Sequence, residues 1–126
     1  MTPLMIGAGE ALWDLLPAGR QLGGAPANFA YHVSLLGDLG LPLSRVGADA
    51  AGNDLVQGLS EAGLDTAHIQ VDAEHPTGTV EVRLDESGQP NYGITEGVAW
   101  DYLEWTDRWR SVAQQADAVC FGTLAQ

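Results

Sequence analysis

Gly23-Gly24-Ala25-Pro26-Ala27-Asn28 is the stretch of this sequence that constrains the backbone most strongly. The two glycines permit positive φ angles and let a ligand approach the main chain without meeting a Cβ atom. Pro26 sets φ near the helical value and lacks only an N–H that the first helical turn leaves unpaired. We therefore expect a helix that offers backbone N–H groups, its positive dipole end and the Asn28 amide to a ligand. A tight turn without function is the alternative.

The helix that begins at this turn carries apolar side chains at helical spacing. Its expected core face consists of Ala27, Ala30, Tyr31, Ser34 and Leu35. Val33 and Leu36 make the opposite side apolar too, so we expect a helix that is covered on most sides and ends at Gly37.

Short apolar runs and helical patterns alternate along the rest of the chain. The predicted strands are residues 4–8, 43–47, 69–71 and 118–121. A second helix carries Leu55 and Leu59 on one face and ends at Gly63, and a third has Thr106 as its N-cap. Residues 17–21 read as a polar loop and residues 39–42 as a Gly/Pro connection. This order predicts an α/β sheet whose ligands bind at the carboxyl ends of strands.

Residues 77–94 have a different pattern, which begins with strict alternation of polar and apolar side chains at residues 79–84. Val80, Val82 and Leu84 share one face of a strand, residues 85–88 form a turn, and residues 90–94 return. A hairpin with one wet face does not match the buried strands of the sheet. We expect it to form a small β lid at about residues 77–95.

The composition excludes several classes of partner. The 126 residues include 17 acidic side chains and only five basic ones, all arginine, for a net charge of −12. This charge disfavours nucleic acid and anionic membranes, and no apolar run approaches membrane-spanning length. The chain shows no signal peptide at its start, and its single Cys120 fits a reduced, buried thiol. We expect a cytoplasmic protein.

Two carboxylates, Glu10 and Asp14, stand among alanine, leucine and tryptophan. Buried carboxylates need partners, and the hydroxyls of a polyol are one suitable set. Turn acids that cap backbone N–H groups are the alternative. A dinucleotide fingerprint at Gly7 and Gly9 is disfavoured because Leu12 holds its third glycine position. Together with the glycine turn, the two acids predict a site for a neutral, hydroxyl-rich molecule.

These segments resemble the opening of the PfkB (ribokinase-like) carbohydrate kinases, and bacterial fructokinases most of all. The resemblance covers essentially the whole chain in an ordered set of motifs: Gly9-Glu10-Ala11-Leu12-Trp13-Asp14-Leu15-Leu16-Pro17, Gly23-Gly24-Ala25-Pro26-Ala27-Asn28-Phe29-Ala30, Leu36-Gly37, Val46-Gly47-Ala48-Asp49 with Gly52, Pro76-Thr77-Gly78-Thr79-Val80, Ala99-Trp100-Asp101 and Phe121-Gly122-Thr123-Leu124-Ala125-Gln126.

The resemblance implies a ribokinase-like α/β sandwich, with a mostly parallel sheet flanked by helices and a β-hairpin lid. Residues 1–126 would be its N-terminal portion, incomplete at the C-terminal side. It also implies phosphoryl transfer from ATP, with Mg²⁺, to a sugar hydroxyl. Relatives of this kind carry a Gly-Ala-Gly-Asp-type motif that supplies the catalytic base, and this chain has none. We therefore expect the chain alone to be inactive, with no catalytic residue and most ATP-binding residues outside it.

The residues that the resemblance assigns to substrate binding are Asp14, Gly23, Gly24, Asn28, Glu10 and Tyr92. Glu10 is a weaker assignment because not all members carry an acid there, and Tyr92 would close over the substrate from the lid. Relatives specific for 2-keto-3-deoxygluconate carry arginine on this part of the lid, whereas Asn91-Tyr92-Gly93-Ile94 has none. A neutral ketose such as fructose is therefore preferred.

Other interpretations remain open at this stage. The kinase could act on 2-keto-3-deoxygluconate or, like ribokinase, on another sugar. The chain could also be a non-catalytic module for sugar binding or dimerisation, and an NAD-dependent oxidoreductase has only Gly7 and Gly9 in its favour. Because a parallel sheet needs cover on both faces, we expect a homo-oligomer formed through the lid or an exposed sheet edge.

Overall fold

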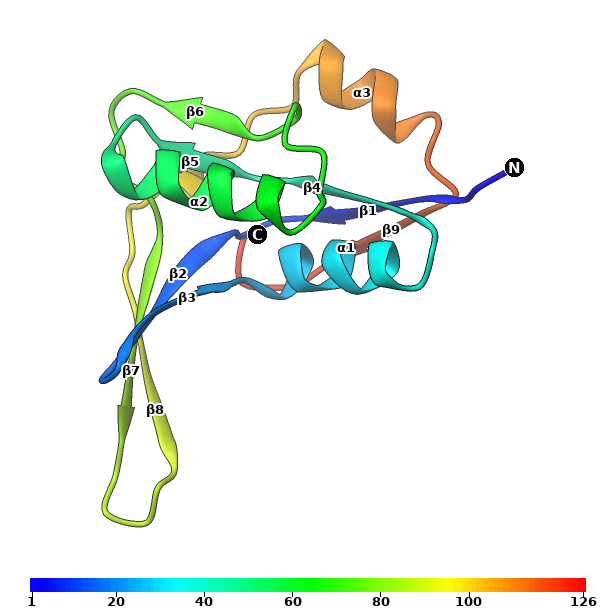
Figure 1. The fold of residues 1–126 in the computed structure, drawn as a ribbon. Helices are drawn as coiled ribbons and strands as arrows, with labels where there is room; N and C mark the ends of the chain where they lie inside the picture. Colours follow the sequence, from blue (N-terminus) through cyan, green and yellow to red (C-terminus); the bar gives the residue numbers. More distant parts are fainter.

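Three parallel strands lie at the centre of the computed structural model, which describes all 126 residues (Figure 1). The middle strand is β1 (Leu4–Ala8), which pairs with β4 (Leu39–Leu43) on one side and β9 (Ala118–Phe121) on the other. A separate pair of parallel strands is formed by β5 (Arg45–Gly47) and β6 (Gln70–Asp72). The predicted parallel α/β architecture is therefore present.

Helices cover both faces of the central sheet. Figure 1 shows α1 (Ala25–Leu35) on one face and α3 (Asp107–Ala113) on the other. Alternate residues of β1 meet the two helices: Ile6 packs with Trp109 of α3, whereas a Cβ at Gly7 would collide with the main chain of α1. The missing side chain thus lets α1 lie directly on the sheet. No helix is long and apolar enough to cross a membrane.

The larger apolar cluster lies between α1, α2 (Ala50–Glu61) and the strand that carries Trp13. Its buried members are Ala11, Trp13, Ala27, Ala30, Val46, Leu55, Leu59 and Leu64. The single-turn helix η1 (Ala99–Tyr102) packs beside β5. The two faces of this core come from the periodic apolar positions of α1 and α2, as expected for amphipathic helices.

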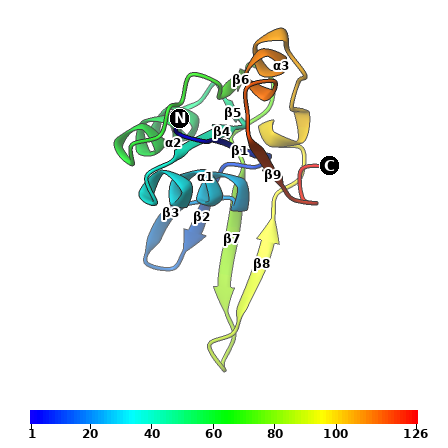
Figure 2. The same ribbon diagram turned by 90° about the vertical axis from the view of Figure 1, so that its right-hand side faces the viewer.

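Two β-hairpins project from the body side by side (Figures 1 and 2). One is formed by β2 (Leu12–Leu16) and β3 (Gly19–Gly23), the other by β7 (Thr79–Leu84) and β8 (Pro90–Ile94). Parallel pairing of β2 with β7 joins them into one sheet of order β3-β2-β7-β8, which we call the lid sheet. The hairpin predicted at residues 77–94 is therefore present, but it is only half of this sheet.

Two predicted connections are wrong, because both segments are strands. Residues 17–21 are not a polar loop, since β3 pairs antiparallel with β2 and only Pro17 and Ala18 turn the chain. Residues 39–42 form most of β4, and the strand predicted at 43–47 is divided at Ser44 between β4 and β5. Pro42 is tolerated because β4 is an edge strand. Both segments gain their order from a partner strand, which local composition does not reveal.

Two predictions of burial are also wrong. Leu35 and Leu36 were expected to be covered, yet they are 63% and 85% exposed, because α1 buries only its sheet-facing side. Strand β9 was expected to be buried, yet Val119 is 48% and Phe121 68% exposed, and Cys120 is only half-buried. The cause is its position: β9 is an edge strand with a partner on one side only.

Candidate functional site

A hollow of about 730 Å³ lies between β3, α1 and the end of α2. Three residues predicted to bind substrate line it together: Asp14 from β2, Gly23 from β3 and Asn28 from the first turn of α1. Its lining also includes residues from both faces of β3, such as Gln21 and Leu22, so the outer edge of this strand runs along the hollow. The hairpin and the glycine turn therefore bring a carboxylate and an amide to one cavity.

Asp14 and Gly23 depend on each other. Both side-chain positions point to the same face of the hairpin, since Asp14 pairs with Gln21 two residues from Gly23. A Cβ at Gly23 would collide with the Asp14 carboxylate. Partial burial raises the pKa of Asp14, because it penalises the charged form. The position thus holds a partly desolvated acceptor that a hydroxyl-bearing ligand can satisfy.

Gly24 shapes the entry to α1. Its φ of +103° is a conformation that other residues rarely adopt, and a Cβ there would collide with the carbonyl of Glu10. The carbonyl of Gly24 accepts a hydrogen bond from the backbone N–H of Asn28 at 2.9 Å, and no side chain caps the helix. The first-turn amides of α1 therefore stay available beside the hollow. Gly24 itself does not line the hollow.

Glu10 and Tyr92 lie outside the hollow. Glu10 is only 4% exposed, and one of its carboxylate oxygens is buried without a hydrogen-bond partner. Tyr92 on β8 is 64% exposed. It pairs with Val82 of β7, and Val80, two residues earlier on β7, pairs with Asp14 of β2. Tyr92 and Asp14 therefore share one face of the lid sheet, but the structure does not bring them into one cavity.

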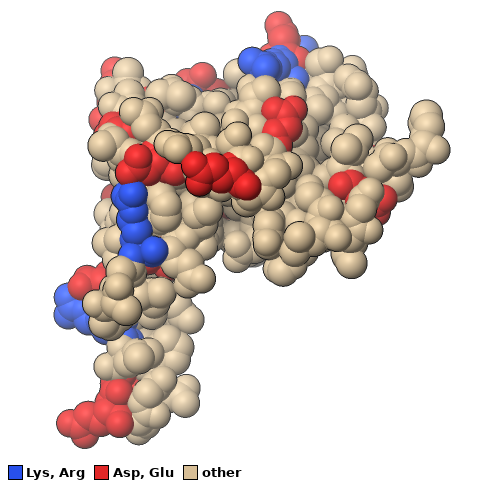
Figure 3. Space-filling model, viewed as in Figure 1, with Lys and Arg blue, Asp and Glu red and all other residues tan.

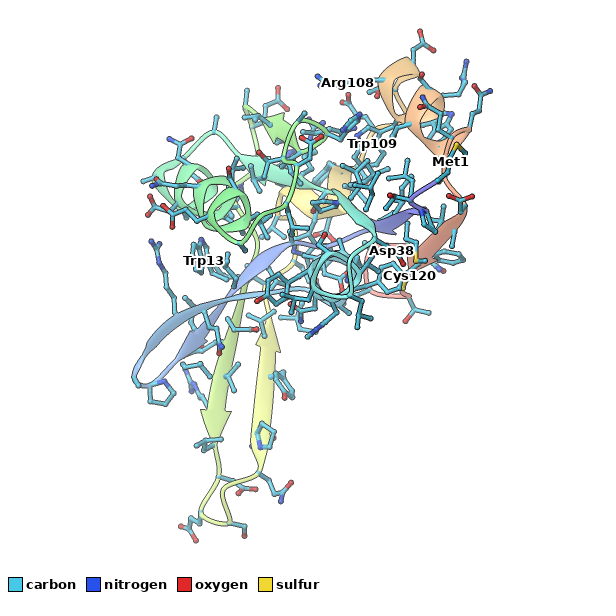
Figure 4. The ribbon with its side chains drawn as sticks, turned by 45° about the vertical axis from the view of Figure 1, so that its right-hand side comes forward. Met1, Trp13, Asp38, Arg108, Trp109 and Cys120 are labelled. Carbon is cyan, nitrogen blue, oxygen red and sulfur yellow. The ribbon has the colours of Figure 1, made fainter.

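Several lining residues were missed by the sequence analysis, above all Trp13 and Arg20. Trp13 lies between the hairpin and α2, and its Nε1 donates to the carbonyl of Ala51 at 2.9 Å (Figure 4). The Arg20 guanidinium carbon lies 4.2 Å from the centroid of the Trp13 ring. His32 of α1 lines the hollow too. The only local signal was the position of Trp13 beside Asp14; the place of Arg20 depends on the pairing of β2 with β3.

A junction of hydrogen bonds around Asp49 and the buried Thr77 joins the lid sheet to the body. Asp49 caps α2 through the Gly52 amide at 2.7 Å, and its carboxylate also accepts from the Thr77 N–H at 3.0 Å and hydroxyl at 2.6 Å. The Thr77 hydroxyl in turn accepts from the Gly47 amide at 2.9 Å. Burial would raise the pKa of Asp49, but the hydrogen bonds from Thr77 and Gly52 outweigh it and lower the pKa. This junction sets where β7 leaves the body.

Another carboxylate, that of the buried residue Asp72, has a structural role. It accepts from Arg45 at 2.9 Å, from the His75 ring at 3.0 Å and from the amides of Glu74 and His75. Burial opposes ionisation, yet these bonds hold its pKa well below the ordinary value. The His75 ring also stacks on Tyr102. No group of three His, Cys, Asp or Glu side chains is arranged to hold a metal ion.

The family was established by comparison with known proteins. The family model described as "pfkB family carbohydrate kinase" matches residues 18–126. The chain belongs to this family. The α/β fold predicted from the resemblance to PfkB kinases is confirmed by solved structures of the family. One is a sugar kinase from Pyrococcus horikoshii, with a TM-score of 0.86 and 31% identity over 97% of this chain and 43% of the other.

Other PfkB relatives are named for their substrate. A fructokinase of Salmonella typhimurium is 39% identical over 89 residues, which are 67% of this chain and 29% of the relative. The solved fructokinase of Vibrio cholerae in its fructose, ADP and potassium ion bound form has a TM-score of 0.67 and 31% identity, over 82% of this chain and 35% of that one. This PfkB chain spans about a third of the length of the curated relatives that it matches.

Proposed function

We propose that this chain is the sugar-binding portion of an ATP-dependent fructokinase, which phosphorylates a hydroxyl of a neutral ketose. The observation that carries the proposal is the hollow shared by Asp14, Gly23 and Asn28. A carboxylate accepts from sugar hydroxyls, an amide both donates and accepts, and apolar walls suit the C–H faces of the ring. Fructokinases among the relatives, one of them bound to fructose, support this choice of substrate.

Each predicted residue has a role in this proposal. Asp14 accepts hydrogen bonds from sugar hydroxyls, and Asn28 orients the sugar through its amide. Gly23 makes room for the Asp14 carboxylate, and Gly24 presents the main chain at the helix entry. Glu10 and Tyr92, which like Gly24 do not line the hollow, act from its surroundings: Glu10 from beneath the Gly24 turn, and Tyr92 from the lid sheet.

The residues present do not fit MgATP. No metal-binding group of side chains is formed, and the sequence has no glycine-rich phosphate loop ending in lysine. One relative, the Pyrococcus horikoshii sugar kinase, has been solved in complex with ATP. We expect the nucleotide to bind mostly to residues outside this chain. Incubation of the chain with MgATP and fructose should therefore produce no more ADP than a control without sugar.

Two alternatives concern the sugar and the assembly. The first alternative is a kinase for a sugar acid, since a 2-dehydro-3-deoxygluconokinase of Thermoproteus tenax is 34% identical over 59 residues. The carboxylate of a sugar acid is best bound by an unpaired cation. The one arginine that lines the hollow, Arg20, is paired with Asp54. The second alternative is a non-catalytic module for sugar binding or dimerisation.

We propose that the chain self-associates whichever of these functions it has, because Leu84 and Ile94 on the lid and Phe121 on β9 are exposed.

Calorimetric titration with fructose tests the proposed site. We expect Asp14→Asn to weaken fructose binding by at least about tenfold, the value of a lost charge-assisted hydrogen bond. The same change should slightly raise the melting temperature, because it removes a charge whose raised pKa shows that the fold disfavours it. Asp38→Asn, which removes an acid outside the hollow, is the control. Equal fructose affinity in wild type and Asp14→Asn would contradict the proposal.

A further inference from the structure

Arg20 is the one arginine that lines the hollow, and its charge is already engaged. Its Nη2 lies 2.6 Å from Oδ2 of Asp54 on α2, with the two side chains 44% and 48% exposed. Figure 3 shows basic and acidic side chains close together where the hairpins leave the body. The hollow therefore contains a cation that is compensated by a neighbouring carboxylate.

The side chain of Arg20 is also held in place. Its guanidinium lies over the Trp13 ring, and Trp13 is fixed to α2 by its hydrogen bond to Ala51. A guanidinium is planar, and all its N–H groups point outward in that plane. When its face stacks on an aromatic ring, these N–H groups remain free to bind a carboxylate at its edge. Here that carboxylate is Asp54. The same donors would bind the carboxylate of a sugar acid or the phosphate of a sugar phosphate if Asp54 were absent.

The acidic side chains around the hollow outnumber its one arginine, which disfavours anionic ligands. Asp14 and Asp54 together outnumber Arg20 at the hollow, in a chain of net charge −12. An anionic ligand would meet repulsion from Asp14 without an available cation to offset it. A neutral polyol does not experience this repulsion.

We propose that Asp54 masks Arg20 and thereby makes the hollow select neutral sugars against sugar acids and sugar phosphates. Asp54 is then a residue that determines specificity without contact with the substrate. The inference rests on the proposed function, because it concerns the ligand of the same hollow. Exposed ion pairs contribute little to folding stability, so the pair can be broken without loss of the fold.

The test compares two ligands, fructose and gluconate, by calorimetric titration of the 126-residue chain at low ionic strength. In Asp54→Asn we expect the affinity for gluconate relative to fructose to rise about threefold to tenfold, because a guanidinium becomes available. The gain should shrink as salt is added. The double variant Arg20→Gln/Asp54→Asn should return to the wild-type ratio. Asp54→Ser, with a smaller neutral side chain, should reproduce the gain.

Glu81→Gln is the matched control. It also breaks an exposed ion pair, with Arg83 at 2.8 Å, and also removes one negative charge, but neither residue lines the hollow. An equal gain in Glu81→Gln would show a general effect of charge and overturn the inference. The inference would also be overturned if wild type binds fructose but the ratio of gluconate to fructose affinity is unchanged in both Asp54→Asn and Asp54→Ser. The proposed function would stand in that case. If wild type binds neither ligand, both fail.

Discussion

Gly23 and Asp14 are diagonal neighbours on one face of the β2–β3 hairpin, and the absence of a Cβ at Gly23 leaves room for the Asp14 carboxylate. We predict that Gly23→Ala lowers the free energy of unfolding by about 1 kcal/mol, the lower end of the cost of overpacking, because the atoms that its Cβ would meet belong to the Asp14 and Leu12 side chains, which can shift. It should also weaken fructose binding, because the Asp14 carboxylate must move. Urea unfolding and calorimetry measure the two effects.

The control for this substitution is Gly122→Ala. No atom lies within 4 Å of the position where its Cβ would be built, and its φ is not positive. Its stability and affinity should match the wild type. If Gly23→Ala behaved in the same way as Gly122→Ala, the close contact with Asp14 would have no energetic importance.

Asp49 predicts how stability depends on pH. Its folded pKa is below the ordinary value of 3.8, so the unfolded state takes up a proton first as the pH falls. Its contribution is therefore fully present above the unfolded pKa and is lost as the pH falls through the folded pKa. We expect the free energy of unfolding to decrease below about pH 4, and the decrease to be smaller in Asp49→Asn. Urea titrations from pH 6 to pH 3 measure it; equal slopes would contradict the prediction.

At the scale of elements, the two hairpins of the lid sheet differ in their support. Strand β2 is anchored by buried Trp13, whereas all residues of β8 are exposed. The start of β7 is held by the Asp49 and Thr77 junction, but Leu84 at its far end is 60% exposed. The outer half of the β7–β8 hairpin therefore depends on its own cross-strand contacts, which are weak in an isolated hairpin.

Hydrogen exchange tests this difference in support. We expect the paired amides of β8 to exchange about two orders of magnitude faster than those of β1, because local opening requires little buried surface to be exposed. The first residues of β2, Leu12 and Trp13, belong to the same sheet but are buried against the body, and their amides should exchange as slowly as those of β1. Equal protection of β8 and β1, measured by NMR or mass spectrometry, would contradict this.

At the scale of the whole molecule, exposed apolar side chains lie at the end of α1, with Leu35 and Leu36, and at two further places that could form a contact between chains. One is the lid sheet, with Leu84 and Ile94, and the other is β9, with Val119 and Phe121. We predict an apparent mass above the 13.3 kDa of the chain in sedimentation at high concentration. Ile94→Glu should lower the mass if the lid forms the contact, and Phe121→Glu if the edge strand does. A monomer at all concentrations would contradict the proposed self-association.

Local chemistry made part of the fold predictable. The start of α1 follows from glycine and proline geometry within four residues, and the strand β7 from strict alternation. The lid hairpin was predictable for the same reason. Of the site, Asp14, Gly23 and Asn28 were nominated from their types and their motifs, and the structure places them around one hollow.

The tertiary structure alone decided the rest. Strand β4 became visible only through its pairing with β1, and β3 only through its pairing with β2. The pairing of Arg20 with Asp54 joins residues 34 positions apart. Side-chain periodicity and turn chemistry act over a few neighbouring residues, whereas strand partners, exposed edges and charge compensation are set by segments that meet only after the chain has folded.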